Sequence, residues 1–429
     1  MTLLTKKHFV FFVLKATSEL DFFVPLIWGI KKRDWDVDVQ VIYLSFNKDN
    51  ILRETQFYSS TLKQLGVREY DLSDILRPAF AILKPLIRRW NRTSLWDTPN
   101  TLGGKFQRIF WKIGKKICEL FIDLKGHLDC LNPSIVFFPI RSFSAPGVDQ
   151  FLSYAYEKKK PVVLFPHGTF GSTGFQSLYF GKEEGLPEFC YYWYPFPLEE
   201  TIDRYPQFHE RIQFSSYPGN DASWIDFLKT QHSKQGEHLR VLFVIRKFGR
   251  SENAAQTDST LTADEFKKTL SAVVQAMKQA QAQLVIKPHP QNNYEAVKEI
   301  MKEFDYDDWI ITYEPIYAES LQADIVLSFG STTVTIPSLQ GKPVILFNDS
   351  IAQEFLEWEG SRKVFEGLVY QLNDIYEFQT TFIEVCCLVR DPELLCVYQE
   401  KALTYFRNYY SAAAINNCLA FLDKMGERF

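Results

Sequence analysis

The chain has 429 residues, of which 46% are hydrophobic and 23% are charged, and its formal net charge is -4. This composition is typical of folded globular proteins with a large buried core, and the length indicates roughly two or three domains. The slightly acidic balance argues against a general nucleic-acid binder, and no apolar run reaches the roughly 18 residues of a membrane-spanning helix.

The first predicted element is an apolar run over residues 8–14. A secretory leader would need a longer run that ends at small residues, whereas Lys15, Glu19 and Asp21 interrupt this one early. The run therefore predicts a buried β-strand in a cytoplasmic protein. The acidic residues that follow it favour the start of a helix, and Glu19 is also a candidate site carboxylate.

Further apolar runs predict strands of the first half at residues 37–44, 134–140 and 161–165. Between the first two lies a predicted basic helical insertion at about 74–120. From Arg77 to Lys116, basic residues interleave with Trp, Phe and Ile, with a single acid, Asp97. Because such segments bind anionic membrane surfaces well, this one is a candidate membrane contact. A polyanionic partner, or a helical pair with a solvated basic face, would give the same pattern.

A histidine-glycine segment, Pro166-His-Gly-Thr-Phe-Gly171, follows the strand predicted at 161–165. His167, with Gly168 and Thr169 after it, would stand at the carboxyl end of that strand, where parallel sheets bind ligands. An imidazole in this position is a candidate general base. The alternative is a structural histidine in a tight turn.

The strand pattern stops between about residues 190 and 236, where Pro, Tyr and Trp give way to a polar stretch. This region is predicted to connect two halves, with a linker over 201–236. The seven cysteines contain no Cys-x-x-Cys pair, which indicates buried thiols in a reducing compartment, without a zinc site or a disulfide framework.

The second half repeats the pattern, with apolar runs at residues 239–245, 284–286, 309–313, 324–327 and 343–347. One helix is predicted to start at the capping box Thr262-Ala-Asp-Glu265 and another at Asn293. The stretch from Pro392 to Phe429 is helical in pattern. Near-continuous apolar strands that alternate with helices predict an α/β fold with parallel sheets covered on both faces.

Charged residues follow the first strand of the second half. Arg246 and Lys247 suit a diphosphate or a carboxylate ligand. Further along, Glu252 and Asp258 are candidate carboxylates for base or covalent chemistry. A solvated loop is the alternative for all of these residues.

The next predicted strand ends in Lys287-Pro-His-Pro290. Lys287 offers charge to a phosphate, and the imidazole of His289 can donate to a phosphate or to a leaving oxygen. The flanking prolines, including Pro290, restrict the backbone. A satisfied histidine in a strand-to-helix turn is the alternative.

A hydroxyl-rich segment, Ser328-Phe-Gly-Ser-Thr-Thr333, follows the strand predicted at 324–327. Gly330 permits close approach of the backbone to a ligand. Ser331, Thr332 and Thr333 open the next helix, whose unpaired N–H groups and dipole attract an anion. Hydroxyls in a row behind a glycine exceed what an ordinary N-cap requires, so the segment predicts a phosphate site.

Two Asp-x-Asp patterns, Asp36-Val-Asp38 and Asp305-Tyr-Asp307, are similar to a metal-binding pair of some transferases. The first precedes a predicted strand and the second lies between a helix and a strand, so exposed turn acids explain both. No metal site and no resident cofactor are expected.

The Lys-Pro-His-Pro turn and the hydroxyl-rich segment, closed by Gly341-Lys-Pro-Val-Ile345, resemble GT-B glycosyltransferases of bacterial surface polysaccharide assembly. The resemblance covers roughly residues 239–347 and is weak before 160. The relatives are users of cytidine-nucleotide donors: capsule and lipopolysaccharide Kdo transferases, bacterial sialyltransferases and CDP-glycerol glycerophosphotransferases. The resemblance implies two Rossmann-like domains whose parallel sheets face a central cleft.

The resemblance also implies roles for individual residues. In these families the His-Pro pair and the hydroxyl-rich segment hold the donor's nucleotide and phosphate, which assigns that role to His289, Pro290, Ser328, Gly330, Ser331 and Thr332. A His-Gly motif supplies the acceptor base in the glycerophosphotransferases, and His167-Gly168 matches it, with Thr169 and Glu19 on the same acceptor side. The chain departs from the pattern at Ile336-Pro337, where many GT-B enzymes have a Glu-Ala that grips the ribose, and it lacks the acidic-glycine motif of sialyltransferases.

The implied organisation is an acceptor domain over 1–200, the linker over 201–236, a nucleotide-donor domain over 237–400, and a C-terminal helix over 401–429 that packs back on the first domain. The implied activity is transfer of a sugar, with CMP-Kdo as the first choice of donor, to a surface polysaccharide or glycolipid. The enzyme would be peripheral on the inner face of the bacterial cytoplasmic membrane. A CDP-glycerol or CDP-ribitol polyol-phosphate transferase, a sugar-nucleotide epimerase and a non-catalytic scaffold are the alternatives.

Overall fold

A computed structural model gives the fold of the protein. It describes residues 7–14, 17–33, 35–44, 55–77, 120–140, 147–166, 188–194, 211–214, 217–232, 238–245, 262–289, 294–329, 335–347, 368–372, 374–409 and 413–428. The chain divides into two compact units. The first unit is Met1–Pro218 with Ala413–Phe429, and the second is Gly219–Ala412.

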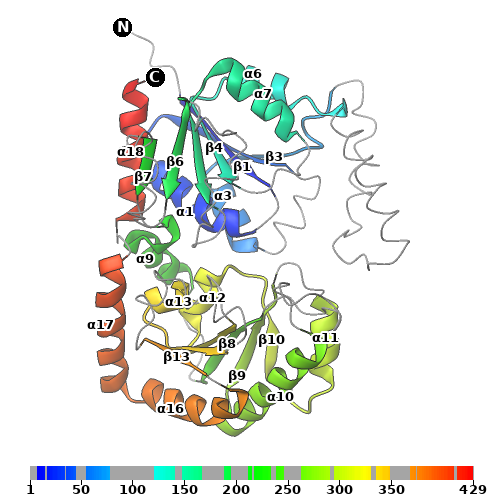
Figure 1. Ribbon diagram of the computed structural model, residues 1–429, viewed down its shortest axis with the longest axis vertical. Coiled ribbons are helices and arrows are strands. Elements are labelled where there is room, and N and C mark those ends of the chain that lie inside the picture. Colours follow the sequence, from blue (N-terminus) through cyan, green and yellow to red (C-terminus); the bar gives the residue numbers. More distant parts are fainter. Residues whose placement is uncertain are drawn as a thin grey trace. The chain divides into compact units, whose positions relative to one another are not determined.

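The first unit is built on a seven-stranded sheet in the order β3-β2-β1-β4-β5-β6-β7, in which all neighbours are parallel (Figure 1). The strands are β1 (Lys7–Val13), β2 (Val37–Tyr43), β3 (Arg68–Asp71), β4 (Ile135–Ile140), β5 (Val162–Pro166), β6 (Cys190–Tyr194) and β7 (Ile212–Phe214). The central strands are apolar almost throughout and buried, as expected for a parallel sheet covered on both faces.

Helices cover both faces of this sheet (Figure 1). They are α1 (Thr17–Lys32), α3 (Gln56–Gln64), α6 (Leu124–Leu131), α7 (Val148–Lys158) and α18 (Ala414–Arg428). Successive side chains of β1 point to opposite layers. Phe11 packs on Phe23 of α1, and Phe12 packs on Phe151 of α7, each with ring centroids 5.0 Å apart.

The helix α18 packs against α1, although the two are far apart in the sequence. Arg33, just after α1, forms an ion pair with Asp423 at 2.9 Å. Gly29 of α1 lies directly beneath Ile415, because a Cβ built at Gly29 would come within 2.2 Å of the Ile415 Cγ2 atom. The missing side chain at Gly29 therefore permits the close approach of the two helices.

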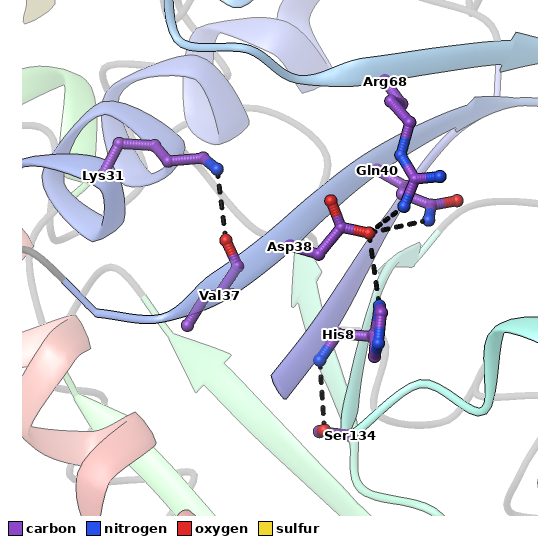
Figure 2. A network of polar contacts seen from close by, with 7 residues as sticks. All are labelled: His8, Lys31, Val37, Asp38, Gln40, Arg68 and Ser134. Carbon is purple, nitrogen blue, oxygen red and sulfur yellow. Dashed lines mark hydrogen bonds and ion pairs between the residues drawn. The ribbon is translucent and has the colours of Figure 1, made fainter. Parts of the chain in front are cut away.

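Polar side chains join the amino ends of β1, β2 and β3 (Figure 2). The Asp38 carboxylate accepts hydrogen bonds from Gln40, at 3.1 Å, and from Arg68, and it lies 3.2 Å from His8 Nδ1. Burial raises the pKa of Asp38, but the bonds from Gln40, Arg68 and His8 outweigh burial and lower the pKa overall. Asp38 lies inside β2 with a side chain only 14% exposed, so the prediction of an exposed turn acid is wrong for it.

The second unit is built on a six-stranded parallel sheet in the order β10-β9-β8-β11-β12-β13. The strands are β8 (Arg240–Val244), β9 (Gln283–Lys287), β10 (Trp309–Ile311), β11 (Ile325–Phe329), β12 (Val344–Phe347) and β13 (Val369–Gln371). The α-helices are α9 (Ala222–Gln231), α10 (Ala263–Ala280), α11 (Tyr294–Lys302), α12 (Ile316–Gln322), α13 (Thr335–Leu339), α16 (Phe378–Arg390) and α17 (Pro392–Tyr409). Two 3-10 turns are η5 (Pro218–Asn220) and η7 (Ile375–Glu377).

The start of α10 is fixed by the predicted capping box. The hydroxyl of Thr262 accepts from the Glu265 N–H at 3.1 Å, and the Glu265 carboxylate accepts from the Thr262 N–H at 2.7 Å. The apolar stripe that begins at Phe266 is buried against the sheet, and the helix ends at Gln281 in the left-handed conformation, with φ of 51°. Local sequence and tertiary packing therefore agree on both boundaries.

Every strand predicted from an apolar run is present, and the C-terminal stretch predicted as helical contains α17 and α18. The prediction that the strand pattern stops after about residue 190 is wrong, because β6 and β7 extend the first sheet. The region predicted as a linker, 201–236, contains β7 and α9. The short strands β3 and β13 were also missed.

The composition led to expectations about membrane-spanning helices and about the cysteines. Among the described residues, no helix is both long enough and apolar enough to cross a membrane. The described cysteines are buried at Cys190, Cys386 and Cys418 and exposed at Cys130, Cys387 and Cys396. The prediction of buried thiols is therefore wrong for the second group.

Candidate functional site

Both sheets share one strand order. In each, the first strand along the chain lies beside the fourth, with the second and third on one side and the later strands on the other. In the first unit, the chain therefore leaves β1 toward one edge strand of the sheet and leaves β4 toward the other. In the second unit, the same is true of β8 and β11. In open α/β sheets, ligands bind outside the carboxyl ends of the strands at this reversal point. Each unit thus has one expected binding position.

In the second unit, the reversal point is flanked by predicted site residues. The strand register pairs Val244 of β8 with Lys287 of β9 on one side and with Ser328 of β11 on the other. These residues form one row across the carboxyl edge of the sheet. Two strand spacings separate Lys287 from Ser328, which is roughly 9.5 Å between their Cα atoms.

Lys287 is half-buried at the end of β9. Its ammonium donates a hydrogen bond to the carbonyl oxygen of Glu314, which follows β10. An ammonium has three donors, so this contact occupies one of them. The contact ties the ends of β9 and β10 together and holds a positive charge at the carboxyl edge of the sheet.

His289 lies two residues beyond the end of β9 and is half-buried, whereas Pro288 between them is buried. The structure therefore places His289 at the same edge as Lys287, one strand from the reversal point. An imidazole at this position can donate a hydrogen bond to an anion bound at the edge.

Ser328 has different surroundings. It lies inside β11, it is fully buried, and its hydroxyl donates to the carbonyl of Phe329 at 2.8 Å. A buried hydroxyl that bonds to the backbone completes the packing of the sheet. These observations favour a structural role for Ser328 over the predicted contact with the donor.

The other predicted site residues lie outside the described residues, and their roles stay predictions. On the donor side they are Arg246, Lys247, Pro290, Gly330, Ser331, Thr332 and Thr333. The catalytic and acceptor-side candidates among them are His167, Gly168, Thr169, Glu252 and Asp258.

A buried polar network lies behind Lys287, and the sequence analysis missed it. Arg240 and Glu319 form an ion pair at 3.0 Å, with side chains 14% and 6% exposed. The Glu319 carboxylate also accepts from the Thr312 hydroxyl at 2.6 Å, and that hydroxyl accepts from the Glu314 N–H at 3.1 Å. Glu314 is the residue whose carbonyl binds Lys287. The network therefore fixes the backbone that holds the cation, and no local motif signals it because its members are far apart in sequence.

In the first unit, Glu19 lies in the first turn of α1, as the helix-start interpretation predicted. It is 1% exposed, and its carboxylate accepts from the Leu14 N–H at 2.6 Å. A carboxylate suits a helix N-terminus, where it meets unpaired N–H groups and the positive end of the dipole. Glu19 therefore closes the turn between β1 and α1, next to the reversal point of the first sheet.

Phenolic and carboxylate groups surround that turn. The Tyr58 hydroxyl donates to Asp21 at 2.6 Å. Burial, and then the negative charges of Asp21 and Glu19, raise the pKa of Tyr217 well above its ordinary value. The described carboxylates beside this turn are therefore acidic neighbours that favour the protonated form of the Tyr217 phenol.

No group of three or more metal-ligating side chains occurs among the described residues. Asp305 and Asp307 are exposed in the connection between α11 and β10, as predicted. Asp38 is engaged by Arg68, which makes it a member of a structural ion pair.

Comparison with known proteins shows the fold. No family model matches the chain, and no curated protein matches its sequence. A protein from Listeria monocytogenes assigned as a UDP-N-acetylglucosamine 2-epimerase is 15% identical, with 99% of this chain and 97% of that chain covered and a TM-score of 0.55. S. aureus MnaA with UDP gives 12% identity, 96% and 94% coverage and a TM-score of 0.55. The glycosyltransferase VinC in complex with dTDP gives 13% identity, 98% and 100% coverage and a TM-score of 0.50.

These similarities extend over nearly the whole of each chain, at sequence identities that establish the fold alone. The predicted GT-B fold class, with two Rossmann-like domains, is confirmed. The similar structures include both epimerases and a glycosyltransferase, and they do not single out the cytidine-nucleotide families.

Proposed function

We propose that the protein is a GT-B glycosyltransferase that binds a nucleotide-sugar donor at the reversal point of its second sheet. One observation carries the proposal: the strands that flank this point, β8 and β11, are the strands that the basic and hydroxyl-rich segments follow in sequence. Lys287 and His289 add a cation and an imidazole from the neighbouring strand. The confirmed fold is one in which such a site is common.

The proposed reaction transfers the sugar from phosphate to an acceptor hydroxyl. The bond between the anomeric carbon and the donor phosphate breaks, a glycosidic bond to the acceptor oxygen forms, and the hydroxyl proton passes to a base, for which His167 is the candidate. Negative charge grows on the departing phosphate. Lys287, His289 and the hydroxyl groups of Ser331 and Thr332 would stabilise that charge, so the reaction needs no resident metal.

A reaction that retains anomeric configuration through a covalent step would need a carboxylate nucleophile. Asp258 and Glu252 are the candidates for that role. In a direct displacement the same carboxylates would instead serve beside His167 as alternative bases.

CMP-Kdo is the first choice of donor, and a capsule or lipopolysaccharide precursor is the first choice of acceptor. Both choices rest on the resemblance of residues 239–347 to cytidine-nucleotide enzymes. A polyol-phosphate transferase using CDP-glycerol or CDP-ribitol would also release CMP, but it would form a phosphodiester. UDP and dTDP, which the similar structures contain, are the nucleotides to compare with the cytidine compounds.

A sugar-nucleotide epimerase is the second candidate. Two structures described as UDP-N-acetylglucosamine 2-epimerases have TM-scores of 0.55 and 0.52 with this chain, both above the 0.50 of the glycosyltransferase VinC. An epimerase needs a nucleotide sugar and no acceptor, which separates it from a transferase in solution.

Calorimetric titration of the full chain with CMP, CDP, UDP and dTDP tests the proposal. Binding of a cytidine nucleotide supports the first choice, and binding of UDP alone supports the epimerase. Binding of none overturns the enzyme proposal in favour of a scaffold. Incubation of labelled CMP-Kdo, CDP-glycerol or UDP-N-acetylglucosamine with membrane extract, followed by analysis of the products, then separates sugar transfer, phosphodiester formation and epimerisation.

We further propose that the basic segment from Arg77 to Lys116 holds the enzyme on the inner face of the cytoplasmic membrane. Vesicles with 30% anionic lipid should sediment with the protein at low salt and release it at high salt, because screening weakens such contacts. Neutral vesicles are the control. Equal sedimentation with both kinds of vesicle, or with neither, would contradict the electrostatic contact.

A further inference from the structure

A cavity of about 370 Å³ lies at the amino edge of the second sheet, opposite the edge proposed for the donor. It is formed where β8 and β11 begin and where α10 and α16 end. Its volume falls in the roughly 300–1,000 Å³ range of small-molecule sites. Leu239, which lines the cavity, is five residue rises from Val244 at the other edge, roughly 16 Å. The cavity is therefore separate from the proposed donor site.

A carboxylate that is held by the sheet lines the cavity. The Asp324 carboxylate accepts a hydrogen bond from the Arg240 N–H at 2.9 Å, and the Asp324 N–H donates to the Arg240 carbonyl at 2.8 Å. These two bonds join the starts of the neighbouring strands β8 and β11, which fixes the position of the carboxylate. A carboxylate can accept several hydrogen bonds at once, including one from a ligand.

A guanidinium and a carboxamide line the same cavity at the ends of two helices. The helices α10 and α16 pack side by side (Figure 1). At the end of α16, the Arg390 guanidinium donates to the carbonyl of Ala280, the last residue of α10, at 3.3 Å. This bond uses one of the five N–H donors of a guanidinium. Gln281 caps α10, and its exposed carboxamide can both donate and accept.

The charges around the cavity favour a ligand without net charge. Arg390 brings one positive charge and Asp324 brings one negative charge. The carboxyl ends of α10 and α16 add a partial negative charge, up to about half an elementary charge each, which disfavours anions. The guanidinium in turn disfavours cations. The cavity therefore suits an uncharged molecule whose polar groups both donate and accept hydrogen bonds.

A sugar has this combination of groups. Each hydroxyl donates one hydrogen bond and can accept two, so adjacent hydroxyls can engage a carboxylate and a guanidinium together. Leu239, Ala280 and Val389 add apolar surface for the C–H face of a sugar ring. We propose that the cavity binds a neutral saccharide unit, as a second site in addition to the donor site. Arg390 and Gln281 donate to its hydroxyls, and Asp324 accepts from them.

This inference goes beyond the proposed function, because the cavity can bind a sugar whether or not the protein transfers one. In a transferase, a site that holds one unit of a long polysaccharide keeps the chain at the enzyme between transfers. The effective concentration of the acceptor then rises without any new contact at the reacting atoms. That role rests on the proposed function, whereas the binding itself does not.

Saturation-transfer NMR of the full chain tests the site with methyl glucoside, methyl galactoside and N-acetylglucosamine as neutral probes. Glucosamine, glucose 6-phosphate and free serine are the cationic, anionic and zwitterionic comparisons. The variants are Arg390→Met, which removes the guanidinium, and Gln281→Gly, which removes the carboxamide and suits the left-handed backbone at this cap. Lys302→Met, at an exposed side chain of α11 outside the cavity, is the matched control.

At least one neutral probe should bind the native protein with a Kd on the order of 1 mM, because a ligand of this size makes few contacts. Arg390→Met should weaken that binding about 10- to 100-fold and Gln281→Gly about 2- to 10-fold, as expected for loss of a charged and of a neutral hydrogen bond. Lys302→Met should bind the probe like the native protein. Circular dichroism and the melting temperature check folding, and Gln281→Gly decides if Arg390→Met unfolds.

Four outcomes would overturn the inference or the function beside it. Absence of binding by every neutral probe overturns the saccharide site. Equal binding by the native protein and both folded variants also overturns it, because the sugar would then lie elsewhere. Tighter binding of a charged probe or of serine overturns the neutral ligand class. Sugar binding without any nucleotide binding overturns the proposed function alone, and nucleotide binding without sugar binding overturns this inference alone.

Discussion

The two sheets have the same strand order, yet the described side chains at the carboxyl edges of their reversal points differ in charge. In the first unit, Glu19 is buried and bonded to the backbone, with Asp21 close by. In the second unit, Lys287 and His289 are half-buried at the end of β9. The topology thus provides a binding position twice, and the side chains decide what each position accepts. An acidic edge disfavours phosphates and a cationic edge attracts them, which supports placing the donor in the second unit.

The largest expected effect concerns the buried ion pair of Arg240 and Glu319, which supports the edge of the second sheet that carries Lys287. Glu319→Ala leaves Arg240 as a buried charge without its carboxylate and should lower the free energy of unfolding by about 3–5 kcal/mol. Urea unfolding of the full chain measures this loss. The double variant Arg240→Met/Glu319→Leu removes both charges and should recover most of the stability. A Glu319→Ala protein as stable as the native one would show that the network does not support this edge.

The next effect tests whether the cationic edge acts on a ligand. His289→Ala should lower the rate of nucleotide release by about 100-fold or more, since a positioned imidazole contributes that much to proton transfer or charge stabilisation. The melting temperature should change little. His238→Ala, at an exposed histidine before β8 in the same unit, is the matched control and should leave the rate unchanged. An unfolded His289→Ala protein would instead support a structural histidine.

At the acidic edge, the comparison predicts a loss of stability. Glu19→Ala leaves the Leu14 N–H without its carboxylate partner and should cost about 1–3 kcal/mol of unfolding free energy. Nucleotide affinity should be unchanged in the folded protein, as measured by calorimetry. A variant of normal stability with weaker nucleotide binding would remove the distinction between the two edges.

The smallest effect concerns the opposite edge of the first sheet, where Asp38 joins the strands (Figure 2). Its folded pKa lies below the ordinary value of 3.8, so its contribution to stability is present above that value and is lost as the pH falls through the folded pKa. Asp38→Asn should cost about 1 kcal/mol at pH 7, a modest value because Arg68 is half exposed. Unfolding measured from pH 7 down to below pH 3 should show the two proteins converge. A difference that stays constant would contradict the ion pair.

The sequence predicted the strands well where both faces of a strand are buried. Strands such as β1 and β11 are buried on both faces, so their apolar runs are unbroken and easy to recognise. The missed strands had weaker signals. The polar β3 and the three-residue β13 are edge strands with few core contacts, and β6 is a run of Cys, Tyr and Trp in a segment that looked irregular.

Only those parts of the candidate site that lie in local sequence motifs could be predicted. The position of Lys287 and His289 at a strand end could be predicted, because the apolar run of that strand is easy to recognise. The partners that hold them could not be predicted, because Arg240 and Glu319 are 79 positions apart and meet only when the sheet forms. Ser328 is a different case, because a motif predicts a ligand contact for a hydroxyl that the fold buries.

The helix α18 has a consequence for biosynthesis. It belongs to the first unit, but it is encoded after the whole of the second. While the ribosome is still translating the second unit, the surface of α1 around Gly29 lacks the helix that covers it. Domains usually fold in the order of their synthesis, but here the first unit must wait for a helix that is made after the second unit. A nascent chain stalled before residue 413 would therefore expose an apolar surface that chaperones recognise.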